Sequence, residues 1–286
     1  MKNLSEHNKG ILFVFIAALL WSSGGLFIKL ISFNAMQLSF FRCSIAALTF
    51  AVLFRKQILF FNKLSLINSI FYSIVLISFV IATKTTTAAN AILLQATAPI
   101  YVLIFEPLIN KTKYTKINVI TVAVCVMGMF LFFVGKIEPS HYEGNFVALV
   151  SGITFAAFFL GMKKNDPKFQ HSSIFWGNII VAFVCLPFLF SLESIKSSDL
   201  LMVSFLGVFQ IAFAYAFLSS GLKRIYAIEA SIISMIEPVL NPVWVFIGYG
   251  EIPSVTAIIG GVIILTSITI RTLITGASII KTKFNF

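Results

Sequence analysis

The feature that most constrains this chain is a series of ten apolar stretches, each about as long as a membrane-spanning helix. Such a helix needs roughly 20 mostly apolar residues to cross about 30 Å of hydrocarbon. The stretches are separated by short polar or charged intervals and cover residues 10–31, 35–54, 64–82, 86–109, 118–134, 144–162, 172–190, 200–220, 227–247 and 254–274. They do not alternate apolar and polar residues as barrel strands do. The sequence therefore predicts an all-helical integral membrane protein with ten transmembrane helices.

The composition excludes most soluble enzymes. Only 11% of the 286 residues are charged and 59% are hydrophobic, whereas about a quarter of an ordinary soluble domain is charged. Ten spans leave only tight loops and two short tails, with no room for a soluble domain of even about 50 residues. We expect the chain to act inside the membrane.

The basic residues indicate an orientation. Positively charged loops stay on the cytoplasmic side of a membrane. With a cytoplasmic N-terminus, sixteen Lys and Arg residues fall inside and three (Lys84, Lys136 and Lys196) fall outside, with Lys29 and Arg42 left within spans. Both termini are therefore predicted to be cytoplasmic, in a multi-pass protein of the inner membrane. Because the excess charge has this use, nucleic acid is not an expected partner.

The two halves of the chain resemble each other. An offset of 139 residues places Pro99 on Pro238, and an offset of 134 places Gly10 on Gly144. Five spans is an odd number, so two such halves, 1–139 and 140–286, have opposite orientations in the membrane. Inverted repeats are typical of secondary transporters, which bind substrate near the bilayer midplane between the repeats.

Several motifs resemble those of a known family. They are Leu20-Trp21-Ser22-Ser23-Gly24, Phe41-Arg42 with Ala46-Ala47-Leu48, Ala96-Thr97-Ala98-Pro99, the run from Ser231 through Glu237-Pro238 to Asn241-Pro242, then Gly250-Glu251 and Gly260-Gly261. Over nearly its whole length the chain resembles the drug/metabolite transporter superfamily, specifically its ten-helix EamA-type members. The resemblance implies an inner-membrane carrier, usually an exporter of amino acids or similar small metabolites, with helices one, three, four, six, eight and nine around a cavity.

Glu237 is the leading candidate for a functional residue, because charged residues within a span are costly. It lies about ten residues into the ninth span, roughly 15 Å deep at 1.5 Å per residue. Glu237 could bind a proton or a substrate ammonium group and release it when the site opens to the other side. The alternative is a structural carboxyl group, hydrogen-bonded to a neighbouring helix before the Pro238 kink.

Three roles are open for Arg42, which lies roughly 10 Å from the outer face. It could pair with Glu237, bind a substrate carboxylate, or extend its side chain to the outer interface. The second helix of the resembling family does not line the cavity, so a structural role is favoured. Glu106 and Glu229 lie near helix ends, where solvation at the interface explains them.

The remaining candidates surround two prolines. Pro99 and Pro238 occupy equivalent places in opposite halves, and Pro242 adds a predicted second break one turn after Pro238. Broken helices are where carriers form binding sites, although packing kinks without ligand contact are an alternative. Polar and aromatic groups suited to a small amphipathic ligand complete the predicted site, namely Trp21, Ser22, Gln95, Thr97, Tyr215, Ser234 and Asn241.

Other kinds of chemistry have no support in the sequence. The three cysteines and His7, His141 and His171 are dispersed without metal-ligand spacing, and no phosphate-binding loop or catalytic motif is present. We expect no cofactor and no metal, and a monomer or weak homodimer. The leading hypothesis is a secondary active transporter that works by alternating access and exports amino acids or similar metabolites, with or without proton coupling. An importer of nucleosides or cofactor-type solutes, a multidrug exporter and, more distantly, a channel are alternatives.

Overall fold

The computed structural model describes residues 5–86, 88–113, 115–132, 134, 142–192, 195–249 and 254–284. Four parts of the sequence predictions lie outside these residues: Lys2 and Lys136 from the loop charges, His141, and the Gly250-Glu251 motif.

Every regular element among the described residues is helical. The α-helices are α1 (Glu6–Trp21), α2 (Gly24–Leu30), α3 (Ala35–Phe54), α4 (Lys63–Thr85), α5 (Ala88–Gln95), α6 (Ala98–Asn110), α7 (Lys116–Phe132), α8 (Tyr142–Lys164), α9 (Gln170–Cys185), α10 (Ser197–Phe205), α11 (Ala214–Leu222), α12 (Ala227–Ser234), α13 (Ile236–Tyr249) and α14 (Val255–Phe284). Short 3₁₀ segments are η1 (Arg55–Leu59), η2 (Pro167–Phe169) and η3 (Leu186–Ser191), and η4 (Leu206–Phe213) is a π-helix. The all-helical prediction is confirmed for this part of the chain.

Local capping explains where several helices begin. Asn34 accepts hydrogen bonds from the backbone N–H groups of Met36 and Gln37 at the start of α3. Asn62 accepts one from Ser65 N at the start of α4, and the Ser65 hydroxyl in turn accepts one from Asn62 N. Such side chains satisfy backbone donors that have no partner within the helix. The apolar runs that follow then continue for a full membrane thickness.

Eight helical stretches among the described residues are long and apolar enough to cross a membrane. They are Glu6–Leu30, Ala35–Leu59, Lys63–Thr85, Asn90–Asn110, Tyr142–Lys164, Pro167–Ser191, Ser197–Leu222 and Val255–Thr275. The fifth predicted span corresponds to a shorter apolar helix, Lys116–Leu131. The ninth corresponds to α12 and α13, which are separated at Met235. The structure is thus that of a multi-pass membrane protein.

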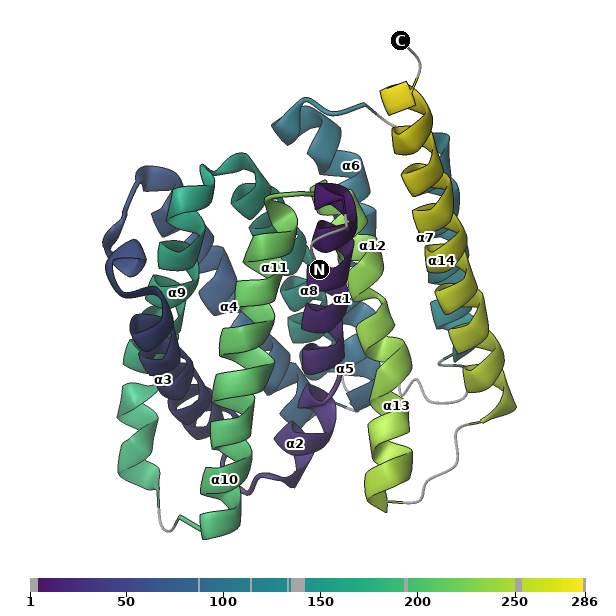
Figure 1. Cartoon of the computed structure of the whole chain (residues 1–286). Coiled ribbons are helices and arrows are strands. Elements are labelled where there is room, and N and C mark those ends of the chain that lie inside the picture. Colours follow the sequence, from purple (N-terminus) through teal and green to yellow (C-terminus); the bar gives the residue numbers. More distant parts are fainter. Residues whose placement is uncertain are drawn as a thin grey trace.

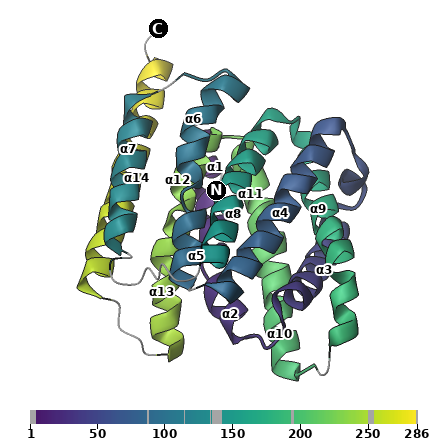
Figure 2. The same ribbon diagram turned by 180° about the vertical axis from the view of Figure 1, so that it is seen from behind.

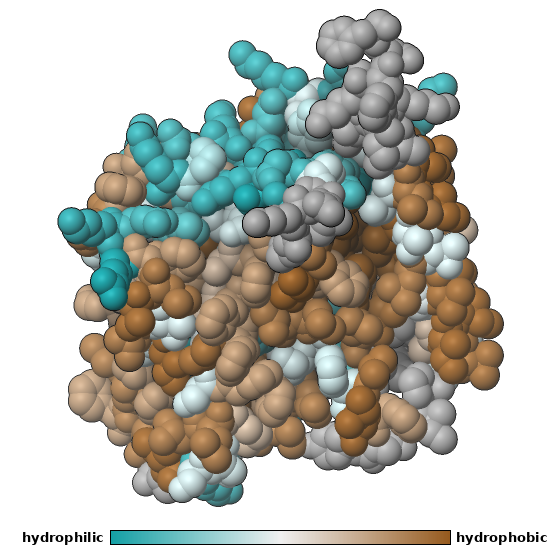
Figure 3. Space-filling model, in the orientation of Figure 1, coloured by the Kyte–Doolittle hydropathy of each residue, from teal (hydrophilic) through white to brown (hydrophobic). Residues whose placement is uncertain are grey.

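Surface polarity agrees with a bilayer environment. Figure 3 shows hydrophilic residues gathered at one end of the visible face, above a wide hydrophobic belt. The start of α1, the turn between α11 and α12 and the end of α6 lie at this end (Figure 1). We call it the polar end.

The helices pack in pairs that combine the two halves of the chain. Helix α1 packs on α11, α4 on α8, α3 on α9 and α7 on α14. The α7 and α14 pair lies side by side at one edge of the bundle, set apart from the other helices in both views (Figures 1 and 2). The central helices α1, α4, α8 and α11 therefore form the core around which a site can be built.

Two glycines allow close helix contacts at opposite ends of the bundle. A Cβ on Gly10 of α1 would lie 2.8 Å from Arg224 Cβ, beyond the end of α11. A Cβ on Gly144 of α8 would lie 2.9 Å from Thr86 N, at the end of α4. Helix α11 ends at the polar end and α4 ends at the opposite one (Figure 2). The first span of each half, α1 or α8, thus packs through a glycine on the third span of the other half, α11 or α4.

Two lysines make a second pair of matching contacts. Lys29 Nζ donates to Thr86 O, 3.1 Å away at the end of α4. Lys163 Nζ donates to Leu222 O, 2.9 Å away at the end of α11. The last carbonyl groups of a helix have no partner within it, and a positive charge there also interacts favourably with the helix dipole. Each lysine therefore stabilises the end of the third span in its own half, α4 for Lys29 and α11 for Lys163.

Both proline-containing helices are interrupted near their middle. Helix α5 ends at Gln95 and α6 begins at Ala98, one residue before Pro99. Helix α12 ends at Ser234 and α13 begins at Ile236, two residues before Pro238. Proline has no N–H and clashes with the preceding turn, which explains why both interruptions precede it.

The predicted second break at Pro242 is wrong, because α13 continues through it to Tyr249. One interruption was not expected from the sequence: α1 ends at Trp21 and α2 begins at Gly24. The Ser22 and Ser23 hydroxyls there donate to the carbonyl oxygens of Leu19 and Leu20, at 2.6 and 2.9 Å. Hydroxyl groups that bond to the preceding turn are known to bend helices.

Candidate functional site

Two small cavities adjoin at the centre of the bundle and share Gln95, Phe155 and Glu237 in their walls. The first lies between the two helix interruptions, with Pro99, Ser234 and Pro238 also in its wall. Each cavity has a volume of about 20 Å³. Because about 10 to 15 Å³ holds one water molecule, neither can hold a metabolite in this conformation. The centre of the bundle is therefore closed, and its cavities have room only for isolated water molecules.

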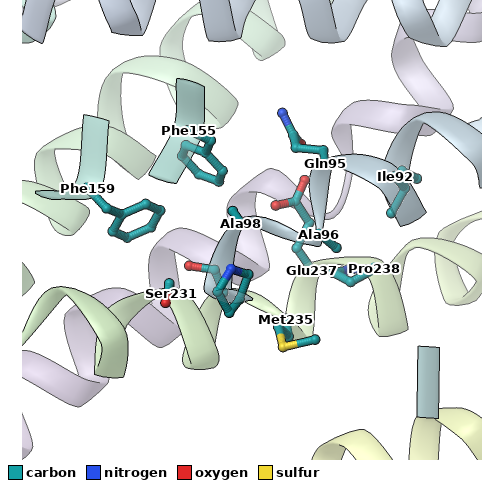
Figure 4. A pocket seen from close by; sticks show the side chains of 12 residues that line it. Ile92, Gln95, Ala96, Ala98, Phe155, Phe159, Ser231, Met235, Glu237 and Pro238 are labelled. Carbon is teal, nitrogen blue, oxygen red and sulfur yellow. The ribbon is translucent and has the colours of Figure 1, made fainter. Parts of the chain in front are cut away.

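Glu237 projects into both cavities from the start of α13. Figure 4 shows its carboxylate on the same side of the first cavity as the Gln95 side chain, with Phe155 and Phe159 across from them. Glu237 is partly exposed, and no hydrogen bond or ion pair joins it to any other described residue. The alternative interpretation, a structural carboxyl group that bonds to a neighbouring helix, therefore has no supporting contact in this part of the chain.

Arg42 lines the second cavity. This is contrary to the expectation that the second span would not line a cavity. The Arg42 side chain is 1% exposed, so extension to the outer interface is wrong. Nη2 donates to Leu76 O at 3.2 Å, while Nε and Nη1 have no hydrogen-bond partner in the part of the chain that the structure describes. Arg42 and Glu237 are not ion-paired, although both line this cavity. A buried cation with unused donors is costly unless a further group compensates it.

Aromatic side chains form the wall between α1, α4 and α11. The ring centroids of Trp21 and Tyr215 are 5.0 Å apart, and those of Tyr72 and Tyr215 are 4.6 Å apart with an edge-to-face angle of 84°. Trp21 packs edge-on against Phe155 at 5.6 Å. Trp21 Nε1 is buried without a hydrogen-bond partner among the described residues, which is unusual because a buried indole N–H normally has one. This wall therefore offers an unused donor on a residue that lines the second cavity together with Arg42.

The other predicted site residues fall into two groups. Gln95 lines both cavities, but its amide nitrogen already donates to Ser151 Oγ at 2.7 Å. Ser234 lines the first cavity and donates to Ala230 O at 2.8 Å. Ser22 and Asn241 line neither cavity, because they join helices: Asn241 Nδ2 donates to Ser22 O at 3.0 Å, and Trp244 Nε1 donates to Ser22 Oγ at 2.7 Å.

Sequence reasoning missed Gln210. It lies in the π-helix η4 and lines the second cavity, and its Oε1 is buried without a partner. Single π-helical turns within α-helices are frequent at functional sites. The signal available in the sequence was a lone glutamine within the eighth apolar stretch. A polar residue within a span is a candidate functional residue, as a charged one is.

Three charged residues at the polar end have definite partners. Glu106 and Glu229 are each only 1% exposed, so solvation at the interface does not explain them. The two oxygens of Glu106 accept hydrogen bonds from Ala227 N and Ile228 N, at 2.7 and 2.8 Å, at the start of α12. Glu229 pairs with Arg271 at 2.5 Å and with His7 at 3.0 Å. Arg271, one of the sixteen basic residues counted on the cytoplasmic side, is buried in α14.

No group of three or more His, Cys, Asp or Glu side chains that could hold a metal ion is found in the described residues. The cysteines Cys43, Cys125 and Cys185 are free and buried. Among the described residues, the centre offers a carboxylate, two guanidinium nitrogens and an indole N–H that have no hydrogen-bond partner, surrounded by aromatic rings. Such a set can bind a small ligand carrying both charges.

Comparison with known proteins agrees over most of the chain. An uncharacterized transporter of Archaeoglobus fulgidus is 23% identical over 257 residues, covering 90% of this chain and 94% of that protein. The uncharacterized transporter YdfC of Bacillus subtilis is 26% identical over 261 residues, covering 85% and 84%. A crystal structure with 16% identity has the same fold, with a TM-score of 0.79 over 93% of this chain and 97% of the other.

The profile of one sequence family matches two ranges of the chain, residues 8–134 and 143–273. These ranges contain the interrupted helices, the central cavities and the residues that line them. The chain therefore belongs to the EamA-like transporter family.

Proposed function

We propose that this transporter is a secondary active carrier of the inner membrane that exports amino acids or similar small zwitterionic metabolites by alternating access. The observation that carries the proposal is the central pair of charges, Glu237 and Arg42, which line one cavity without pairing. A carboxylate suits a ligand ammonium group, and a guanidinium suits a ligand carboxylate. Trp21, which lines the same cavity, supplies a further unused donor through Nε1.

The architecture we propose has ten spans arranged as two inverted five-helix repeats, residues 1–139 and 140–286. The two ranges matched by the family profile support the division. The matching contacts support the inversion: Gly10 and Gly144, and likewise Lys29 and Lys163, are 134 residues apart and contact α11 and α4 at opposite ends of the bundle. Helices α7 and the α12–α13 pair supply the fifth and ninth spans.

The closed centre supports the proposal of alternating access. A space for isolated waters must enlarge to hold a metabolite, and the interrupted helices α5–α6 and α12–α13 border it. Rocking of one repeat against the other would open the site to one side at a time. In the proposed orientation the polar end and both termini face the cytoplasm, because Lys and Arg gather there.

Substrate class is tested by transport into liposomes that contain the purified protein. Amino acids, nucleosides and cationic drugs are offered in radiolabelled form. We expect saturable uptake of an amino acid that is accelerated by unlabelled substrate on the other side. Analogues that lack the amino or the carboxyl group should compete about ten- to a hundredfold less well, because each loses a charged hydrogen bond. Selective uptake of a nucleoside or a drug would refute the zwitterion proposal, and unsaturable flux would favour a channel.

Proton coupling is tested with Glu237→Gln. If Glu237 exchanges a proton for the substrate, an imposed pH gradient accelerates transport by the native protein and not by the variant. Glu143→Gln is the matched control, since Glu143 is exposed and makes no hydrogen bond among the described residues. Full acceleration of Glu237→Gln by the gradient would contradict coupling through this residue.

A further inference from the structure

A much larger cavity lies at the polar end, away from Glu237. It lies between the starts of α1 and α12 on one side and the α7–α14 pair on the other, and its volume is about 570 Å³. Small-molecule sites typically measure roughly 300 to 1,000 Å³. We call it the polar-end crevice. The α7–α14 pair that forms one of its walls lies at the edge of the bundle (Figures 1 and 2).

The lining of the polar-end crevice has an excess of positive charge. Lys163, Arg224 and Arg271 line it, against the single carboxylate of Glu229 among its described lining residues. Glu6, which is not among these lining residues, pairs with Arg224 Nε at 2.8 Å. Arg271 is held in place by Glu229 at 2.5 Å and by Asn118 Oδ1, which accepts from Nε at 3.1 Å. Its Nη2 makes no bond to any described residue. The fixed guanidinium therefore keeps a donor for a further anionic group.

The same crevice has apolar walls next to these charges. Ile117 and Ile274, from α7 and α14, line it together with Ile225. Further along the α7–α14 pair, Ile120 and Ile270 are exposed and border a second apolar groove. An occupant must therefore be anionic at the polar end and apolar along the helices, which describes a phospholipid with its phosphate at headgroup level.

We propose that the polar-end crevice binds the headgroup of an anionic phospholipid, with Lys163, Arg224 and Arg271 around its phosphate and the acyl chains along α7 and α14. Basic pockets between transmembrane helices are known to bind anionic headgroups. The bound lipid fills the space that separates the α7–α14 pair from α1 and α12. This proposal does not depend on which metabolite is transported.

The test is native mass spectrometry of the full-length protein in detergent, offered equal amounts of phosphatidylglycerol and phosphatidylcholine. The variant is Lys163→Gln/Arg224→Gln, which leaves the buried Glu229–Arg271 pair intact. The matched control is Lys164→Gln/Lys223→Gln, since both lysines are exposed, adjoin the tested residues in sequence and do not line the crevice. Circular dichroism and the melting temperature report whether each variant is folded.

We expect the native protein and the control to retain phosphatidylglycerol preferentially, and the variant to lose about thirtyfold of this preference. That factor corresponds to two charges at about 1 kcal/mol each. If the double variant does not fold, Arg224→Gln alone should lose about fivefold. An unchanged preference in the variant, or no preference in the native protein, overturns the proposal. Displacement of the lipid by excess inorganic phosphate also overturns it, because the site would then bind a free anion.

Discussion

The contact between Glu106 and the start of α12 yields the sharpest stability prediction. Glu106 belongs to α6, and its two carboxylate oxygens accept the N–H groups of Ala227 and Ile228. The residue thus caps a helix more than a hundred positions away and joins the two interrupted helices. We consider Glu106→Gln, which keeps the size of the side chain and removes its charge.

The magnitude follows from the two hydrogen bonds. A glutamine oxygen can accept one of the N–H groups, and the other then faces the amide NH₂. One hydrogen bond to a charged group is lost, worth about 1.5 to 3 kcal/mol, together with a favourable charge at the positive end of a helix. We expect a loss of roughly 2 kcal/mol. By the scaling for domains of about 150 to 250 residues, the melting temperature falls by roughly 4 to 8 °C.

The assay is thermal unfolding of purified protein in detergent, followed by intrinsic fluorescence. Glu143→Gln is the control, because Glu143 is likewise acidic and lies at the start of a helix, α8, but is exposed. Glu106→Ala should be less stable than Glu106→Gln, since both N–H groups are then buried without a partner. If Glu106→Gln melts within about 1 °C of the native protein, the reasoning is refuted.

The same melting assay checks three further predictions. Arg271→Met leaves the Glu229 carboxylate, 1% exposed, without its main partner and should cost about 3 to 5 kcal/mol; part of the loss should return in Arg271→Met/Glu229→Gln, and no return would contradict a charge effect. Gly207→Ala places a Cβ 2.8 Å from Arg42 O, so overpacking should cost about 1 to 3 kcal/mol, and native stability would mean that η4 and α3 separate freely. Asn62→Ala removes the cap of α4 and should cost about 0.5 to 2 kcal/mol, whereas an unchanged melting temperature would show that the cap contributes nothing.

The position of a residue along its helix could be predicted from the sequence because it follows from counting along an apolar run. Glu237 lies at the centre of the bundle as counted, and the helices are interrupted just before Pro99 and Pro238. Both results depend on properties local to the chain: the rise of a helix per residue and the missing N–H of proline.

The direction in which a side chain points could not be predicted in the same way. Ser22 adjoins Trp21 in sequence, yet Trp21 lines the cavity while Ser22 bonds to α13. Glu106 and Glu229 lie near helix ends as predicted, but their partners lie on helices far away in sequence. A helix with apolar residues on all faces gives no amphipathic signal for its inward side. Which face is buried is therefore decided by tertiary packing.

The hydrogen bonds of Glu106 have a consequence for alternating access. At the polar end, opening between α6 and α12 breaks both bonds of Glu106, worth about 3 to 6 kcal/mol together. At the opposite end, Lys29 and Lys84 donate to the carbonyl groups of Thr86 and Ile31, and Ser32 donates to the Asp199 carboxylate. The two Glu106 bonds by themselves should lower the population open at the polar end by about a hundredfold or more without substrate. A reporter cysteine at Ser231, which lines the first cavity behind Glu106, should react slowly with a polar thiol reagent added from the polar side. Glu106→Gln should increase that rate, whereas equal rates in both proteins would show that these bonds do not control opening.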